Sequence, residues 1–334
     1  MAASTWDCFL TLLQAGLWEK DVELPDTPDE ATWELMLRWA RGQAVTGLLL
    51  RSFTHLPEHQ VPPATVRMRW IVEADLLDRK GTRVARVEQE ALALFLKEGL
   101  QPIIQKGSRS ARHYAYPALR ISGDVDLFFP EASFDRAVTL VPDARRAPDG
   151  SYVFKREGVP VELHPRYYDL HVDPASLPEP ESVCGELLLL SAHTLKHALG
   201  AGVGLKQLCD MARALYDCEG QYDKRELAAA LERARIDRWH ALLCSLLVSD
   251  LGLDPSYCLD GFTATDPAAL RDIVRAGGNF GQAAEARKKA LRHRSAFARK
   301  ASTAFSFLKR LPFSLRVAPQ ETRATIRELV KGNL

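Results

Sequence analysis

The stretches Gln105-Lys-Gly-Ser108 and Arg120-Ile-Ser-Gly-Asp-Val-Asp-Leu-Phe-Phe129 decide the fold that this sequence predicts. The second stretch places Asp124 and Asp126 two residues apart in an apolar run of β-branched and aromatic residues, which predicts a strand. Side chains alternate along a strand, so both carboxylates are expected to leave the same face. Such a pair can hold Mg²⁺, although the spacing alone more often marks a turn at the end of a solvated strand.

The first stretch predicts a turn that can bind phosphate. A short strand over residues 101–105 is followed by Gly107 and Ser108 and then by a helix through Tyr114. Glycine permits close approach of a ligand, the serine hydroxyl and backbone N–H groups bind oxygens, and the start of a helix carries partial positive charge. Gly-Ser alone is weak evidence, and its position one strand before Asp124 and Asp126 gives it weight.

The segment after these aspartates predicts a third carboxylate on the same sheet. A helix is expected over residues 131–141, and the alternating segments 151–155 and Val159–His164 predict a hairpin. Glu162 points away from its apolar neighbours, so it joins the two aspartates if the strands are adjacent; otherwise it is a solvent-facing residue on an edge strand. Three carboxylates can hold two magnesium ions, one on phosphate groups and one at an attacking hydroxyl.

Helices are predicted on both sides of this unit. Apolar residues recur at helical spacing over residues 6–53 and 64–98, and Gly99 ends the second pattern. After a proline-rich linker at 173–181, helical patterns occupy residues 187–198, 205–216, 224–235, 239–251 and 266–275. The predicted fold class is therefore α+β, with an N-terminal helical region (1–99), a small α/β core (100–172) and a C-terminal helical region (183–334).

Composition places the chain among soluble globular proteins. Its 334 residues are 46% hydrophobic, which is enough for a sizeable core and about two domains. The six cysteines lie far apart without a Cys-x-x-Cys pair and are expected to be reduced. The sequence shows neither a signal peptide nor an apolar run long enough to span a bilayer, so a cytoplasmic location is expected.

Charge is distributed unevenly along the chain. The formal net charge is only +1, but residues 282–334 contain thirteen basic and three acidic residues. Aromatic residues interleaved with basic ones can bind single-stranded nucleic acid, a membrane surface or an acidic partner. The favoured alternative is a helix that packs an apolar stripe while its charges stay solvated or pair with the acidic remainder. The apolar residues concerned are Phe297, Phe305, Phe307, Leu308 and Phe313.

Together these residues resemble the poorly characterised bacterial nucleotidyltransferase family of the DNA polymerase β-like superfamily. The resemblance covers roughly residues 100–216. Val-Glu-Leu-His164 and a helix with two histidines before an aspartate support it. These residues taken together indicate the family more specifically than any one of them does alone. Its strongest residues are Lys106, Gly107, Ser108, Arg120, Asp124, Asp126 and Glu162.

The resemblance implies a polymerase β-like core that transfers a nucleoside monophosphate from a triphosphate, with ATP expected, to a hydroxyl acceptor, releasing pyrophosphate. It implies Mg²⁺ as the cofactor, two ions being expected and Mn²⁺ being the alternative. The acceptor, whether peptide, small molecule or RNA, stays open, and no membrane insertion is expected. The implied catalytic and metal-binding residues are Asp124, Asp126 and Glu162. The implied nucleotide-binding residues are Lys106, Gly107, Ser108 and Arg120.

Two other functions are compatible with these residues. A toxin or antiphage enzyme that modifies tRNA would use the basic C-terminal region to hold its acceptor. A non-catalytic binding protein on the same fold is less favoured, because a degenerate site is expected to have lost one of the three carboxylates.

Several further residues are expected near the site. His193 and His197 are spaced to bind zinc from one helix, but the Glu of His-Glu-x-x-His is missing, so a structural or pocket-wall role is favoured. Asp210 is expected to cap or line the same cleft. The fifteen residues 109–123, which separate Ser108 from Asp124, make Arg112 and His113 additional neighbours of the site.

Overall fold

The computed structural model describes residues 4–120, 122–147, 149–200, 202–262, 265–277 and 310–331. The chain begins with three helices, α1 (Thr5–Trp18), α2 (Glu30–Gln43) and α3 (Thr46–Ser52). Ser4 and Asp7 cap the start of α1 reciprocally, and the Asp29 side chain accepts a hydrogen bond from the Thr32 amide at the start of α2.

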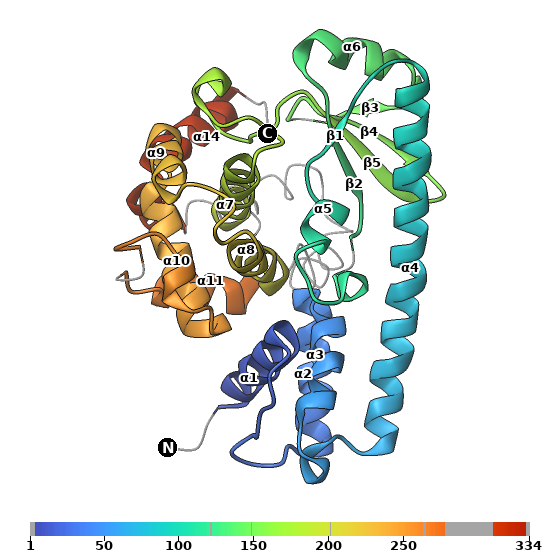
Figure 1. Ribbon diagram of the computed structural model, residues 1–334, viewed down its shortest axis with the longest axis vertical. Coiled ribbons are helices and arrows are strands. Elements are labelled where there is room, and N and C mark those ends of the chain that lie inside the picture. The colour runs from blue at the N-terminus through green and yellow to red at the C-terminus, as the bar shows by residue number, and fades with distance from the viewer. Residues whose placement is uncertain are drawn as a thin grey trace.

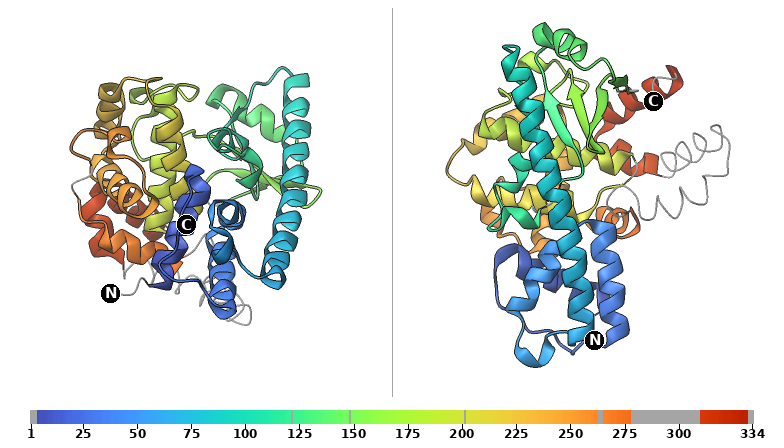
Figure 2. Two further views of the ribbon diagram at one scale, coloured as in Figure 1. Left: turned by 60° about the horizontal axis from the view of Figure 1, so that its bottom comes forward. Right: turned by 90° about the vertical axis from the view of Figure 1, so that its right-hand side faces the viewer.

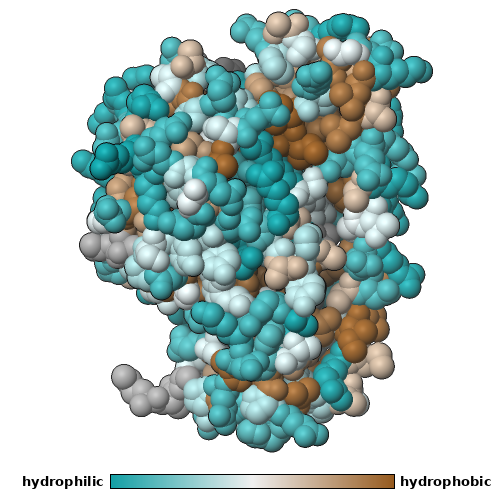
Figure 3. Space-filling model, in the orientation of Figure 1, coloured by the Kyte–Doolittle hydropathy of each residue, from teal (hydrophilic) through white to brown (hydrophobic). Residues whose placement is uncertain are grey.

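The long helix α4 (Ala64–Lys97) runs beside both the N-terminal helices and the sheet (Figure 1). It ends where the sequence predicts, because Gly99 takes a φ of +73° that glycine adopts without strain. The first half of α4 also exposes four apolar side chains, and apolar surface is visible over this part of the molecule (Figure 3). The exposed residues are Met68, Ile71, Val72 and Leu76.

A five-stranded sheet lies beside the second half of α4. Its strand order is β1-β2-β5-β4-β3, in which only the β2/β5 pair is parallel. The strands are β1 (Ile103–Ile104), β2 (Val125–Phe128), β3 (Arg145–Arg146), β4 (Tyr152–Arg156) and β5 (Val159–His164). The short helix α5 (Ser108–Ala111) follows β1, and α6 (Glu131–Thr139) lies in the connection between β2 and β5.

The C-terminal helices form the other side of the molecule (Figures 1 and 2). They are α7 (Val183–Leu199), α8 (Leu205–Asp217), α9 (Lys224–Ala234), α10 (Asp237–Leu251), α11 (Ala268–Gly277) and α14 (Pro319–Lys331), and residues 310–317 are also helical. Most of the basic region, including Phe297, Phe305, Phe307 and Leu308, lies outside the described residues. Phe313 lies within them and packs partly buried on the helical core.

Two hydrophobic cores hold the described residues together. The larger core joins α1–α3 and the first half of α4 to the C-terminal helices, and α1 packs directly on α10. The smaller core lies between one face of the sheet, α6 and the second half of α4, from which Val84, Val87, Ala91 and Phe95 point inward. The long helix therefore contributes to both cores, and the opposite face of the sheet is left for polar residues.

The structure confirms most of the predicted elements and changes three of them. The helix after Gly107 ends at Ala111 rather than at Tyr114, because the chain then turns toward α8. The turn-rich segment 143–150 contains the additional strand β3, which hydrogen bonds to β4. Asp124 lies just before β2 rather than inside it. All six cysteines are free, as expected, and no described helix combines the length and the apolarity that a membrane span requires.

Candidate functional site

The parallel pairing of β2 with β5 brings the predicted carboxylates together. Asp126 lies directly opposite Glu162, and Phe128 lies opposite His164. Because side chains alternate, the neighbours of Asp126 on β2 point into the smaller core while Asp126 and Glu162 share the polar face. The condition that the two strands be adjacent is therefore met, and all three predicted acids line one cleft.

This cleft has a volume of about 210 Å³ and lies between the sheet and the helices α7 and α8. Six carboxylates and four lysine or arginine side chains line it, so the carboxylates are in excess by two when histidines are neutral. The sheet and its connecting loops contribute Lys106, Gly107, Ser110, Arg120, Asp124, Asp126, Asp149, Glu162, His164 and Asp169. The helical wall contributes Leu190, His193, Thr194, Lys196, His197, Lys206, Gln207 and Asp210.

Of the three predicted acids, Asp126 is the one that contacts both a lysine and a histidine among the described residues. Its Oδ1 atom lies 3.2 Å from Lys106 Nζ and 3.0 Å from His164 Nε2, and its side chain is buried. Burial alone would raise its pKa, but the charge of Lys106 and the hydrogen bond from His164 lower the pKa well below its usual range. Asp126 is therefore ionised at neutral pH.

Glu162 has the opposite shift. Burial and the neighbouring charge of Asp126 raise its pKa above the usual value for glutamate. A carboxylate whose pKa is raised is a better proton acceptor than an ordinary one. The neighbouring side chains of Asp126 and Glu162 thus combine a carboxylate that is ionised at neutral pH with a carboxylate whose pKa is raised.

The Gly107–Ser108 turn differs from the predicted phosphate-binding turn in two respects. Gly107 has φ +72° and ψ −116°, a conformation that favours glycine, and it lines the cleft. Ser108 instead donates its hydroxyl hydrogen to Glu88 Oε1 of α4 at 2.6 Å, and it does not line the cleft. In addition, α5 has only four residues, so the partial charge at its start is small.

Arg120 reaches the cleft but is already paired. Its guanidinium forms a two-pronged ion pair with Asp210 of α8, with distances of 2.9 and 2.6 Å, and Asp210 also accepts a hydrogen bond from the Tyr114 hydroxyl. All of these groups are buried or nearly so. Burial would raise the pKa of Asp210, but its contacts, above all those with Arg120, lower the pKa below its usual value. The pair therefore stays ionised. Arg120 thereby ties the loop before β2 to the helical wall.

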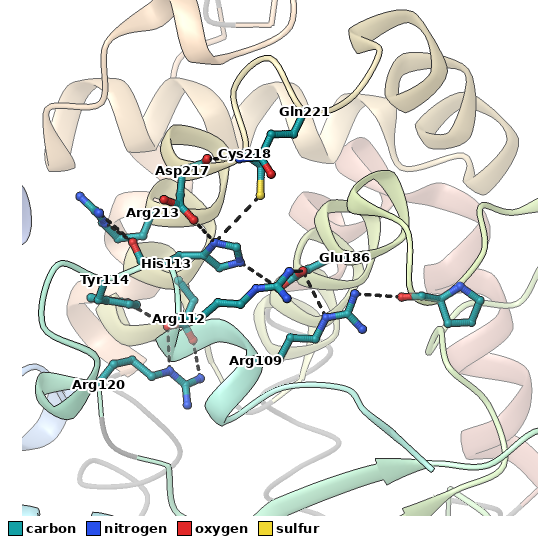
Figure 4. Close-up of polar contacts among 12 residues, drawn as sticks. Arg109, Arg112, His113, Tyr114, Arg120, Glu186, Arg213, Asp217, Cys218 and Gln221 are labelled. Carbon is teal, nitrogen blue, oxygen red and sulfur yellow. Dashed lines mark hydrogen bonds and ion pairs between the residues drawn. The ribbon is translucent and has the colours of Figure 1, made fainter. Parts of the chain in front are cut away.

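A second polar network fastens the same loop to α7 and α8 (Figure 4). His113 is buried, and its ring nitrogens lie 2.8 Å from Asp217 and 2.9 Å from Glu186. Burial lowers its pKa, but contacts with Cys218, Glu186 and Asp217 raise the pKa to about 10. His113 is therefore a cation between two carboxylates, and it anchors the loop rather than entering the cleft. Arg112, the other residue expected near the site, pairs with Glu186.

The helical wall presents two histidines and two lysines to the cleft. His193 and His197 lie with their Nε2 atoms 3.0 Å apart, and burial together with the charge of Lys106 lowers the pKa of both, to about 3 for His197. Both are neutral at pH 7. Among the described residues no third His, Cys, Asp or Glu completes a metal group with them, and both line the cleft.

Of the two lysines of this wall, Lys196 pairs with Asp169 at 2.9 Å, and Lys206 is the other cation. Burial, followed by repulsion from Arg120, lowers its pKa to about 8. Within the described residues its ammonium group forms no hydrogen bond or ion pair, in contrast to Lys106 and Arg120. Among the residues that the structure describes, this positive charge therefore has no ion-pair partner at neutral pH.

Sequence reasoning missed several residues with contacts at the site, including the following four. They are Glu88, His164, Asp169 and Lys206. His164 had a local signal, because it lies two residues after Glu162 on the same face of the predicted strand. The other three are brought in by packing between distant elements, which no spacing in the chain reveals.

The donor atoms around Asp126 fit a divalent cation. Asp126, Glu162 and His164 each offer one atom, and these atoms lie within 4.8 Å of one another. Carboxylate oxygens suit Mg²⁺ and Mn²⁺, and the excess of two carboxylates along the cleft matches the charge of one such ion. The chemistry of these donors therefore agrees with a metal-dependent transferase.

Comparison with known proteins supplies the family. No curated protein and no solved structure matches this chain. A family model described as an uncharacterised nucleotidyltransferase matches residues 29–250, which include the sheet, the cleft and the helices α7 and α8. The match thus extends on both sides of the segment that the motifs cover. The chain belongs to this uncharacterised nucleotidyltransferase family.

Proposed function

We propose that this protein transfers a nucleoside monophosphate from a nucleoside triphosphate, with ATP as the expected donor, to a hydroxyl group, and releases pyrophosphate. The observation that carries the proposal is the register of β2 and β5, which sets Asp126 beside Glu162 on the wall of a cleft whose other wall presents Lys206. Acids on one side, and on the other a lysine that has no ion-pair partner within the described part of the chain, match a substrate that carries both phosphates and metal ions.

In this proposal the chain's own residues position the substrates. Asp124, Asp126 and Glu162 would hold divalent cations, which neutralise charge on the phosphates and lower the pKa of the attacking hydroxyl. Lys106 and Lys206 bind the non-bridging phosphate oxygens, and Gly107 lets the backbone approach them closely. Ser108 joins them only after its hydroxyl leaves Glu88.

The bond changes follow from this arrangement. The acceptor oxygen forms a bond to the α-phosphorus, and the bond from that phosphorus to the bridging oxygen breaks, so that pyrophosphate leaves. The Glu162 carboxylate, beside the acceptor, accepts the proton of the acceptor hydroxyl. Positioning and electrostatics supply most of the rate, as in other phosphoryl-group transfers.

A binding measurement tests the proposal without knowledge of the acceptor. Triphosphates labelled at the α-phosphate are equilibrated with the protein at fixed Mg²⁺ or Mn²⁺ and again after chelation. We expect metal-dependent binding that weakens at least about tenfold in Asp126→Asn and Glu162→Gln. The matched control is Asp143→Asn, because Asp143 pairs with Arg156 on the surface and does not line the cleft. Equal binding with and without metal in all variants would refute the proposal.

Transfer itself is tested by mass. Candidate peptides, small molecules and RNAs are incubated with ATP and metal, and their intact masses are compared with those after incubation with Asp126→Asn. A gain of one nucleotide monophosphate that requires Asp126 identifies donor and acceptor together. Metal-dependent binding without any gain across all three acceptor classes would instead favour a binding protein on this fold.

A further inference from the structure

His164 lies among the donor atoms of the proposed metal centre. Its side chain is nearly buried, and its Nε2 atom lies 3.0 Å from Asp126 Oδ1 and 3.6 Å from Glu162 Oε2. The resemblance described above implies carboxylates alone as metal ligands and gives His164 no role in binding the metal. The imidazole therefore adds a donor of a different chemical kind.

The register of the strands explains why His164 reaches both acids. His164 and Glu162 are two residues apart on β5 and share a face, and Asp126 on β2 lies opposite Glu162 and diagonally from His164. The position of His164 is therefore set by the pairing of two strands within one sheet and not by a loop. The three donor atoms consequently converge from two adjacent strands.

The spacing of these atoms matches cis ligands of one ion. Two ligands at about 2.1 Å from a metal and at right angles to each other lie about 3.0 Å apart. The separations of 3.0 and 3.6 Å from Nε2 to the two carboxylates are close to that value. A hydrogen bond to Asp126 alone would not require Nε2 to face Glu162 as well.

Lys106 holds the same oxygen that His164 contacts. Its ammonium group lies 3.2 Å from Asp126 Oδ1, so it supplies positive charge where a cation would bind. A bound ion would displace this contact and free Lys106 for a phosphate oxygen. Exchange of one cation for another keeps the buried carboxylate neutralised in both states.

We infer that His164 is a nitrogen ligand of the metal centre, beside Asp126 and Glu162, and that the site therefore selects Mn²⁺ over Mg²⁺. Imidazole suits first-row transition ions, whereas Mg²⁺ prefers oxygen ligands and retains its water. The inference rests on the proposed function for the purpose of the ion, but the ligand set can be tested without any turnover.

Pulsed electron paramagnetic resonance of Mn²⁺ bound to the full-length protein tests the assignment. Mn²⁺ alone serves as the probe, and the protein is prepared with natural and with ¹⁵N-labelled histidine. We expect nitrogen modulation from a coordinated imidazole that changes with the isotope. The modulation should persist in His59→Gln, which alters an exposed histidine, and in His193→Gln, which alters the opposite wall. It should disappear in His164→Gln.

Titrations of free Mn²⁺ and of Mg²⁺ separate ligation from positioning. Loss of a ligand should weaken Mn²⁺ binding by about tenfold or more in His164→Gln while Mg²⁺ binding changes little. Absence of Mn²⁺ binding, absence of histidine modulation in the wild type, or equal weakening of both metals would overturn the inference. Absence of histidine modulation in the wild-type spectrum needs no variant, so this outcome overturns the inference even if His164→Gln misfolds.

The two proposals fail separately. Histidine-coordinated Mn²⁺ without metal-dependent binding of a triphosphate would overturn the proposed function and leave the ligand assignment standing. Triphosphate binding that depends on Mg²⁺ and Mn²⁺ equally, with no histidine modulation, would overturn the ligand assignment and leave the proposed function standing.

Discussion

Lys206 shows how a single side chain can report on the ligand of the cleft. It faces the cleft, forms no hydrogen bond or ion pair within the described residues, and has a pKa lowered to about 8 by burial and by Arg120. We expect Lys206→Met to weaken binding of a triphosphate about tenfold, because a charge-assisted hydrogen bond is worth roughly 1.5–3 kcal/mol.

The same lysine predicts a pH dependence. Only the protonated form attracts phosphate, so affinity should fall as pH rises through about 8, the pKa of Lys206. Titration calorimetry at a series of pH values measures this. Lys206→Met should lose this part of the pH dependence and Lys206→Arg should retain affinity at high pH. Lys155→Met, which alters an exposed residue of β4, should behave like the wild type. Unchanged affinity in Lys206→Met would exclude the lysine from phosphate binding.

His113 gives a second prediction, for stability. Its pKa is 6.5 when unfolded and about 10 in the native protein, so the native state binds the proton more tightly. The resulting stabilisation is complete below about pH 6.5 and is lost as pH rises toward 10, by about 2–4 kcal/mol. Chemical denaturation between pH 6 and pH 10 measures the loss.

The controls for His113 are simple. His113→Gln should be less stable than the wild type at pH 6 and should show a flatter pH profile, while His59→Gln, which alters an exposed histidine, should keep the wild-type profile. A wild-type free energy of unfolding that does not fall over this range would contradict the ion-pair geometry of His113 with Glu186 and Asp217.

The residues that sequence reasoning could find are those whose spacing is local. Asp124 and Asp126 form a pair within three positions, and Glu162 alternates with apolar neighbours on one strand, so their shared face follows from the period of a strand. Lys206 and Glu88 have no such signal, because each enters the site from a helix whose position depends on tertiary packing. Their roles and those of the predicted residues stay proposals until the variants are measured.

At the scale of elements, the turn at Gly107 carries a third prediction. Its φ of +72° and ψ of −116° favour glycine, and an added Cβ would lie 3.2 Å from Ser122 Oγ. We expect Gly107→Ala to lower the free energy of unfolding by about 1–3 kcal/mol and to weaken triphosphate binding. Thermal denaturation and binding titration measure the two effects.

Gly99 provides the matched control for this turn. It also has a positive φ, of +73°, but an added Cβ would meet nothing within 4 Å, and it lies at the end of α4. Gly99→Ala should therefore cost some stability and leave binding unchanged. Equal effects of both substitutions on binding would show that the Gly107 turn does not approach the ligand.

Element boundaries show where local pattern suffices. The end of α4 and the β4/β5 hairpin were predicted, because a glycine after a long amphipathic run and alternation across a turn are local signals. The early end of α5 and the presence of β3 were not, since the first depends on contacts of the loop with α8 and the second on pairing with β4. In both cases contacts with another element overrode the local preference.

At the scale of the molecule, the sheet depends on a helix that precedes it in the chain. The apolar face of the sheet is covered by four residues of α4, Val84, Val87, Ala91 and Phe95. The ring of Phe95 packs edge-on against the ring of Phe129, with their centroids 4.8 Å apart. We expect a fragment of residues 100–172 to be unfolded, because this face would be exposed to water, and a fragment of residues 80–172 to recover native-like secondary structure. Circular dichroism and amide spectra of both fragments measure the difference.

This fragment pair also tests the predicted domain limits. A stable, folded fragment of residues 100–172 would support the limit between 99 and 100, whereas the opposite result would extend the core backward into α4. The sequence could not decide the matter, because one continuous helix serves both hydrophobic cores and leaves no linker to mark a boundary. The role of the basic C-terminal region likewise stays a prediction.

The buried pair of Arg120 and Asp210 has a consequence for the history of this family. The two residues are 90 positions apart, yet removal of either would leave its partner charged inside the protein, at a cost of about 3–5 kcal/mol. Selection is therefore expected to act on the pair as one heritable unit, so that descendants either keep both or replace both. A lineage that lost only one should show a compensating change near Tyr114, which shares the same carboxylate.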